Sequence, residues 1–283
     1  MSSRLFDGIG VGKPLLCLAL TFSSLLGIAF DDLGHLDRFL KQALAAFCLF
    51  FGSACLNNFQ DRHGDKLLTR TRGRALPLGR LAPLGVLVQA VTFLGLGLAG
   101  LFWVGGGPAP CVWALVGVVL YNGVYTPLKS RTVWALVPGA LSGAVPVAMG
   151  WSGAVGGGLP PGLWAVMGLM VVWQFPHAWL VLLSHPWGEP IPLLALFRRD
   201  QLERILLVWI SLWGSGLAMF VLFKPDLVGV VAWIMGANGL GVVLFFGVRL
   251  WVPGGGSARL GFRVFNASLV VFMAALMADG LVG

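Results

Sequence analysis

Charged side chains are scarce in this sequence. Lys, Arg, Asp and Glu make up 11% of the 283 residues, whereas soluble domains carry roughly 25%. The mean hydropathy is +0.88, and no polar stretch is long enough for a separate soluble domain or a low-complexity tail. These deficits exclude an ordinary globular or disordered protein and place the chain in the membrane class.

The sequence also has few cysteines and no convincing phosphate loop. Its four cysteines lie in apolar stretches without the paired spacing of a metal site, so we expect them to be packing residues: Cys17, Cys48, Cys55 and Cys111. The glycine-rich stretches at 105–108 and 156–162 follow no predicted strand. They therefore do not fit the strand–loop–helix pattern of a phosphate loop.

Long apolar stretches are abundant and predict an all-α membrane fold. Each is close to the roughly 20 residues that a helix needs to cross the hydrocarbon. They fall at about 11–30, 42–58, 83–103, 110–127, 134–151, 161–183, 205–223, 227–248 and 264–282. The first lacks a convincing cleavage site and eight others follow it, so it is interpreted as a helix and not a signal peptide. We expect nine transmembrane helices in a single domain, 1–283.

The excess of basic residues predicts the topology of these helices. The net charge is +8, and alternating loops put sixteen of the nineteen Lys and Arg residues on one side; the other side holds Arg38, Lys41 and Lys224. Positive loops stay in the cytoplasm. We therefore expect the N-terminus and the basic loops to be cytoplasmic and, with nine spans, the C-terminus to be outside. The basic charge then reflects topology and not nucleic-acid binding.

Two of the eleven acidic residues lie in the stretch NNFQDRHGDKLLTRTRGRALPLGR, residues 57–80. If the second span continues as a helix past Asn58, then Asn57, Asp61 and Asp65 are spaced i, i+4, i+8 and share one face. Oxygen ligands of this kind suit Mg²⁺, which bridges to phosphate oxygens of a substrate. The spacing predicts a magnesium site.

Basic side chains follow these carboxylates at once. Lys66, Arg70, Arg72 and Arg74 can donate charge-assisted hydrogen bonds to the same phosphate groups. The alternative is a solvated cytoplasmic loop in which Asp and Arg side chains only pair with each other. Spacing alone leaves both interpretations open.

Two further stretches are candidates for the site. YNGVYTPLKSRTVW (121–134) carries Lys129 and Arg131, which by themselves fit the positive-inside pattern equally well. In WQFPHAW (173–179), Pro176 is expected to interrupt a helix at membrane depth beside His177. Histidine is a common haem ligand. A histidine bonded only to a backbone carbonyl is the alternative.

Together these motifs resemble the UbiA family of intramembrane prenyltransferases. The family pattern N-x-x-x-D-x-x-x-D followed by R-T-x-x-R-P-L-P is similar to Asn57, Asp61, Asp65 and RTRGRALP (70–77). YTPLKSRT (125–132) and GAVPVAMGW (143–151) resemble two further family motifs, and Lys-Pro at 13–14 also fits. WQFPHAW resembles the motif of the branch that farnesylates haem, the haem O synthase (protohaem IX farnesyltransferase) branch.

The resemblance implies an activity and a set of roles. It implies nine helices around a central cavity, Mg²⁺ as cofactor, farnesyl diphosphate as donor and haem B as acceptor, giving haem O. A bacterial cytoplasmic (inner) membrane is the implied location, with a haem A synthase or a terminal-oxidase assembly factor as partner. The implied site residues are Asn57, Asp61 and Asp65 for catalysis and metal binding, Lys66, Arg70, Arg74, Lys129 and Arg131 for the diphosphate, and Trp173 and His177 for haem.

The sequence departs from the family where a second aspartate motif is expected. The corresponding run is HPWGEPIPLL (185–194), with His185 near the aspartate position and Glu189 as a nearby carboxylate. Either one metal with Lys129 and Arg131 suffices, or Glu189 substitutes, or the protein has lost catalysis and only binds haem or lipid. Other substitutions fall at Ala75, Ser130 and Ala135. A prenyltransferase acting on a quinone precursor or another aromatic acceptor is a further alternative.

Overall fold

The computed structural model describes residues 2–29, 36–105, 107–154, 158–183, 196–224, 226–251 and 258–282, and these are almost entirely helical. The α-helices are α1 (Ser2–Val11), α2 (Pro14–Ala29), α3 (Leu36–Asp61), α4 (Pro83–Val104), α5 (Ala109–Val118), α6 (Thr126–Leu128), α7 (Leu136–Ala154), α8 (Pro161–Leu183), α10 (Arg199–Phe223), α11 (Gly229–Trp251) and α12 (Ala258–Val282). Shorter elements are the 3₁₀ helices η1 (Gly64–Leu67) and η3 (Val133–Ala135) and the π-helix η2 (Val119–Tyr125).

These helices confirm the predicted all-α membrane fold. Eight helical segments of the described chain are long and apolar enough to cross a membrane, and α2 is a shorter apolar helix. Large apolar side chains point outward along them, as lipid contact requires: Leu84, Trp103, Leu222, Phe223 and Trp233 are each at least 70% exposed. The chain is therefore an integral membrane protein.

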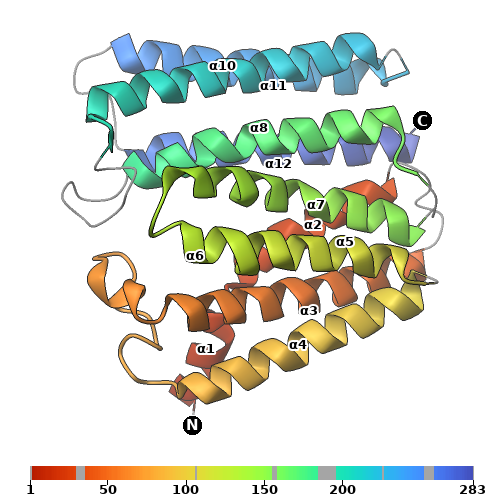
Figure 1. Cartoon of the computed structure of the whole chain (residues 1–283). Coiled ribbons are helices and arrows are strands. Elements are labelled where there is room, and N and C mark those ends of the chain that lie inside the picture. Colours follow the sequence, from red (N-terminus) through yellow and green to blue (C-terminus); the bar gives the residue numbers. More distant parts are fainter. Residues whose placement is uncertain are drawn as a thin grey trace.

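The helices that follow one another in sequence also pack as neighbours in space. The series runs from α2 through α3, α4, α5, α7, α8, α10, α11 and α12, and α12 returns to α2. The N-terminus lies at one end of the bundle, beside the loop that follows α3, and the C-terminus lies at the other end (Figure 1). This arrangement fits an odd number of crossings.

The structure contains a first helix that the apolar pattern does not predict. α1 precedes the first predicted span and is tied to the bundle by an ion pair of 3.0 Å between Asp7 and Arg80. It ends before Pro14, because the residue before a proline is pushed out of the α-helical conformation. Lys13 instead adopts a left-handed φ of 50°. Such a conformation for a non-glycine residue is typical of functional sites.

Glycine lets α2 and α7 cross in close contact. A Cβ atom on Gly27 would lie 2.1 Å from the carbonyl oxygen of Val147, and one on Gly150 would lie 1.8 Å from that of Ser24. Any larger residue would separate the two backbones, as at the small-residue contacts of other membrane helices. The crossing holds α7 closely against α2.

Asp279 in α12 holds together the end of the bundle opposite the N-terminus. One carboxylate oxygen pairs with Lys224 at 2.8 Å and the other accepts the backbone N–H of Val228 at 2.9 Å. We expect Asp279→Asn to lower the free energy of unfolding by about 1–3 kcal/mol, because the amide keeps an acceptor but loses the charge. Thermal unfolding in detergent measures this loss. The control is Asp226→Asn, whose carboxylate pairs with the same lysine but is 73% exposed and should contribute little.

The pH dependence of this ion pair separates its charge from its packing. Partial burial opposes the charge of Lys224, but Asp279 and Asp226 outweigh it and raise the pKa of Lys224 above 10.5. Stabilisation from a raised lysine pKa is complete below 10.5 and is lost as pH rises through the raised value. The Tm difference between wild type and Asp279→Asn should therefore be constant from about pH 7 to pH 10 and shrink above that. A difference that disappears by pH 8 would contradict the assignment.

Candidate active site

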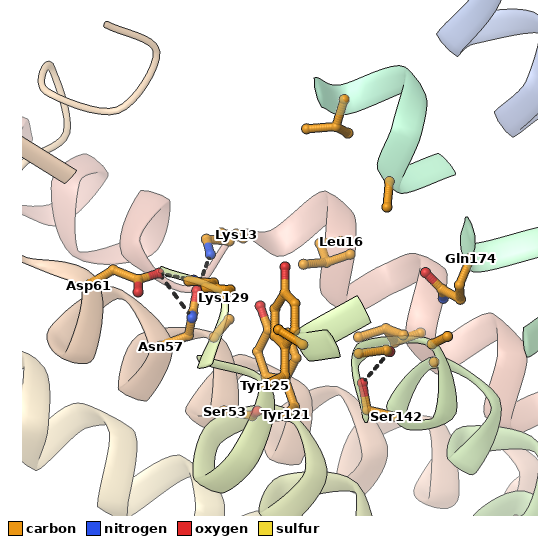
Figure 2. Close-up of a pocket in the computed structure, with 18 of the residues that line it drawn as sticks. Lys13, Leu16, Ser53, Asn57, Asp61, Tyr121, Tyr125, Lys129, Ser142 and Gln174 are labelled. Carbon is orange, nitrogen blue, oxygen red and sulfur yellow. Dashed lines mark hydrogen bonds and ion pairs between the residues drawn. The ribbon is translucent and has the colours of Figure 1, made fainter. Parts of the chain in front are cut away.

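A cavity of about 870 Å³ opens between the helices of the first half of the chain and α8. One end is lined by charged and polar side chains from the end of α3, the following loop and the end of α6. The rest is lined mainly by apolar residues of α2, α3, α5, α7 and α8, with Phe262 of α12. Figure 2 shows Asp61 and Lys129 at one side, the tyrosines in the middle and Gln174 beyond them. The cavity thus joins a polar mouth to an oily interior.

Asp61 is the last residue of α3 and is bound by side chains from two other elements. It pairs with Lys129 and accepts a hydrogen bond of 3.0 Å from Asn57, one turn earlier. An acidic group at a helix C-terminus opposes the helix dipole, so local helix stability does not explain it. The position of Asp61 is instead explained by a nearby cation. Lys129, which follows α6, compensates the carboxylate charge at the cavity mouth.

The prediction that Asp65 shares one helical face with Asn57 and Asp61 is wrong. α3 ends at Asp61, and Asp65 lies in the separate turn η1. Contacts with the later part of the loop position it there. Arg74 pairs with its carboxylate at 2.7 Å, and the Thr71 hydroxyl donates to its backbone carbonyl at 3.0 Å. The loop therefore folds back and returns Asp65 to the cavity.

The exposed fractions distinguish between the two interpretations of this stretch. The carboxylates do pair with basic side chains, as the alternative interpretation expected. However, the side chains of Asp61 and Asp65 are 15% and 7% exposed, and both line the cavity. A solvated loop would leave them in water. Asp65 is buried and Asp61 is largely withdrawn from water, and both carboxylates are paired with cations and face a cavity.

Lys13 is a site residue that the motif spacing did not identify. It lines the polar mouth, and its ammonium donates to the side-chain oxygen of Asn57 at 2.6 Å. Burial, together with the charges of Arg74 and Lys129, lowers the pKa of Lys13 from 10.5 to about 8. An anion bound in the mouth would raise it again. Its position directly before a proline at the start of a span was the available signal.

The chain has only two tyrosines, and both line the cavity between its polar mouth and its interior. The rings of Tyr121 and Tyr125 stack with centroids 5.6 Å apart. They lie on the π-helix η2, an element frequent at functional sites, and are clearly visible in Figure 2. Asn122 fastens this segment to α3 by accepting from Ser53 at 2.6 Å and donating to Gln60 at 3.2 Å.

His177 lines the interior of the cavity on α8. The predicted helix interruption at Pro176 is wrong: α8 runs continuously from Pro161 to Leu183 with this proline inside it. Trp173, one turn earlier, is buried beside the imidazole with ring centroids 4.6 Å apart. Trp173 therefore backs the histidine and is not itself among the cavity-lining residues.

The remaining predicted residues divide into three groups. Arg70 and Arg74 line the cavity mouth beside the acidic residues. Lys66 and Arg131 are exposed and do not line it. His185 and Glu189 lie outside the described residues.

The polar mouth offers oxygen atoms of the type that bind a hard cation. Within the described ranges, no group of three or more His, Cys, Asp or Glu side chains could hold a metal ion. The carboxylates of Asp61 and Asp65 and the amide oxygen of Asn57 nevertheless line one mouth. Mg²⁺ keeps several waters and needs only one or two carboxylates together with substrate phosphate oxygens. The residues present therefore fit Mg²⁺ bound jointly with a phosphate ligand.

The fold and the site define a polytopic membrane protein with a polar, charge-compensated mouth leading into an apolar cavity, as an intramembrane enzyme for amphiphilic substrates requires. The chain belongs to the UbiA prenyltransferase family, whose sequence model matches residues 17–270.

Three of its relatives share one name. The chain is 31% identical over 269 residues to the protoheme IX farnesyltransferase of Nitratidesulfovibrio vulgaris, with 92% of this chain and 88% of the relative covered. It is 37% identical over 176 residues to that of Geobacter sulfurreducens, covering 61% and 63% of the two chains. It is 28% identical over 260 residues to that of Christiangramia forsetii, covering 88% and 85%.

Solved structures share the fold at much lower identity. A UbiA homolog from Archaeoglobus fulgidus bound to GPP and Mg²⁺ superposes with a TM-score of 0.70 at 17% identity, covering 98% of this chain and 100% of that one. A UbiA homolog from Aeropyrum pernix K1 gives 0.70 at 15% identity, covering 93% and 97%. A digeranylgeranylglyceryl phosphate synthase gives 0.72 at 11% identity, covering 99% of each.

Proposed function

We propose that this protein transfers the farnesyl group of farnesyl diphosphate to a vinyl group of haem B and so makes haem O. The observation that carries the proposal is the cavity itself, which joins a basic and acidic mouth to an apolar interior containing His177. The name shared by the relatives supports the choice of acceptor.

The polar mouth is the donor end of the site in this proposal. Asn57, Asp61 and Asp65 would hold Mg²⁺, which when bound neutralises charge on the departing diphosphate. The cations Lys129 and Arg74, now paired with Asp61 and Asp65, can turn toward the diphosphate once the metal balances the carboxylates. Lys13 and Arg70 add positive charge at the same mouth.

The middle and interior of the cavity suit the chemistry that follows. The C–O bond of the allylic diphosphate breaks, and diphosphate leaves with the electron pair. The rings of Tyr121 and Tyr125 can stabilise the resulting cation through their π-faces. The apolar walls keep water from hydrolysing it prematurely.

The acceptor then closes the reaction. The terminal vinyl carbon of haem B attacks the first carbon of the farnesyl cation, leaving a new cation on the carbon next to the porphyrin ring. Water adds there and loses a proton, so haem B, farnesyl diphosphate and water give haem O, diphosphate and a proton. His177, backed by Trp173, would hold the porphyrin so that its vinyl group meets the farnesyl carbon.

The arginines of the RTRGR run provide a test of the donor end. Arg70 and Arg74 line the mouth, whereas Arg72 is exposed and does not. Charge-assisted hydrogen bonds to an anion contribute about 1.5–3 kcal/mol, so we expect Arg70→Ala and Arg74→Ala each to weaken farnesyl diphosphate binding by about 10- to 100-fold. Haem binding should be unchanged. Isothermal titration with each ligand measures both.

Arg72→Ala is the matched control, since it removes the same charge from the same loop. It should leave both affinities within about twofold of wild type. Equal loss of donor and haem binding in Arg70→Ala or Arg74→Ala would indicate misfolding and contradict the assignment.

The location and route of the product complete the proposal. The protein would lie in a bacterial cytoplasmic (inner) membrane with its N-terminus and basic loops in the cytoplasm and its C-terminus outside. The end of α3 and the loop after it, whose residues line the donor mouth, lie at the end of the bundle that carries the N-terminus (Figure 1). The mouth would then face the water-soluble diphosphate, and haem O would pass to a haem A synthase or a terminal-oxidase assembly factor.

Mass spectrometry of haems extracted from cells that produce the protein tests this function. The proposal expects haem O to accumulate with the wild-type protein and to disappear when the farnesyl diphosphate supply is blocked. Unchanged haem B together with a prenylated quinone precursor would instead identify another aromatic acceptor. Unchanged haem B without a prenylated product would indicate a protein that only binds its ligands.

A further inference from the structure

Asn266 on α12 is in contact with the candidate haem-binding histidine, and no motif pointed to it. Its side-chain oxygen lies 3.0 Å from Nδ1 of His177. Its side-chain nitrogen donates to the backbone carbonyl of Phe262, one turn earlier, at 2.5 Å. The second contact determines the first: because the amide nitrogen is used within α12, the amide presents its oxygen to the imidazole.

An oxygen facing Nδ1 decides which tautomer of His177 is present. The amide oxygen can only accept, so Nδ1 must carry the hydrogen and donate it. A neutral imidazole protonated on Nδ1 has its lone pair on Nε2, and a neutral ring is far cheaper than a charged one to bury in an apolar interior. The rings of Trp173 and Phe262 lie 4.6 and 5.2 Å from the imidazole and limit its rotation.

We infer that Asn266 is a positioning residue that holds His177 in the Nδ1–H form, so that Nε2 is the axial ligand of the haem iron of the acceptor. Metal-binding histidines commonly donate their second N–H to an oxygen of the protein in this way. This inference rests on the proposed function, because it takes haem as the ligand of the cavity. It adds a contact from α12 to the acceptor end of the site, the apolar interior that contains His177. The rest of the site is built mainly from α2, α3, α5, α7 and α8.

If Asn266 sets the tautomer of His177, substitutions at position 266 should differ in their effect on haem binding. Asn266→Leu removes the acceptor at similar volume, so the ring can return to the Nε2–H form, which has no lone pair on Nε2 for iron. Asn266→Asp keeps an oxygen at the same place and should preserve the tautomer. The control is Asn238→Leu on α11, which removes a half-buried amide that bonds the Ser268 carbonyl at 2.9 Å and not the histidine.

The experiment is a titration of haem B into the full-length protein in nanodiscs, followed by absorption and electron paramagnetic resonance spectra. Wild type, Asn266→Asp and Asn238→Leu should give the spectrum of histidine-ligated haem. Asn266→Leu should lose that spectrum and bind haem about 10- to 100-fold more weakly. It should still bind a farnesyl diphosphate analogue that cannot ionise, which shows that the variant is folded.

Each other outcome has a defined meaning. A histidine-ligated spectrum that survives in Asn266→Leu overturns the role of Asn266 but leaves haem as the acceptor. Loss of the spectrum in Asn238→Leu as well shows a general packing effect and also overturns it. Failure of the wild-type protein to bind haem contradicts the proposed function itself, and with it this inference.

Discussion

Replacing either aspartate of the polar mouth should abolish prenyl transfer while leaving a folded, membrane-inserted protein. We expect Asp61→Asn and Asp65→Asn each to reduce turnover by about 100- to 1,000-fold, the range seen when one electrostatic group is removed from an active site. The amide keeps the size of the side chain but lacks the negative charge that binds Mg²⁺. Turnover at saturating Mg²⁺ and farnesyl diphosphate, with Tm as a check of folding, measures this effect.

The loss must be separated from the loss of an ion pair. Each aspartate also holds a cation, Lys129 or Arg74, so a purely structural role would lower Tm and leave the Mg²⁺ concentration for half-maximal turnover unchanged. A metal-binding role instead shifts that concentration upward. Asp37→Asn is the control, because this exposed carboxylate pairs with Lys41, one turn away, and does not line the cavity. Near wild-type turnover in either site variant would remove the metal assignment.

The second large effect concerns His177. We expect His177→Ala to weaken haem B binding and to lower transfer to haem by about 100-fold, because the porphyrin loses the group that orients its vinyl carbon. Magnesium-dependent binding of farnesyl diphosphate should persist, because the polar mouth is formed by other elements. Spectral titration of haem and calorimetric titration of the donor measure the two affinities separately.

His63 provides the matched histidine control. It lies in the loop after α3, is exposed and does not line the cavity, so His63→Ala should leave both affinities unchanged. If haem binding is unchanged in His177→Ala, the imidazole only packs against Trp173 and Phe262, and the acceptor end of the site is wrongly assigned.

The fold could be predicted because the bilayer imposes a simple rule on the sequence. Each long apolar stretch must become a helix to satisfy its own backbone, so the predicted spans 83–103 and 161–183 closely match α4 and α8. Basic residues collect in alternate loops, and the sidedness that this pattern predicts stays a prediction. The amphipathic helix α1 escaped prediction because it does not have the continuous apolar pattern of a spanning helix.

The site could be predicted in its residue types but not in its local geometry. The i, i+4, i+8 spacing predicted one helical face, yet Asp65 reaches the cavity because Arg74 and Thr71 pull the loop back after Asp61. Pro176 predicted an interruption, yet α8 continues through it. Both outcomes depend on tertiary contacts, which sequence spacing does not contain.

The residues to which the sequence assigned no role in the site have the same explanation. Lys13 and Asn266 each lie far along the chain from the groups they touch, Asn57 and His177. Tyr121 and Tyr125 are two ordinary aromatic residues in sequence, and only the π-helix and its anchor through Asn122 bring both to the cavity. A short motif cannot reveal a contact between distant helices.

In the proposed reaction, one cavity brings together a farnesyl cation, a haem vinyl group and water. The most direct measurement is mass spectrometry of the haem formed by the purified protein in proteoliposomes with haem B, farnesyl diphosphate and Mg²⁺ in ¹⁸O-labelled water. We expect a product heavier than haem B by one farnesyl group and one labelled hydroxyl, with release of diphosphate. Consumption of farnesyl diphosphate to labelled farnesol with haem B unchanged, or no consumption at all, would contradict it.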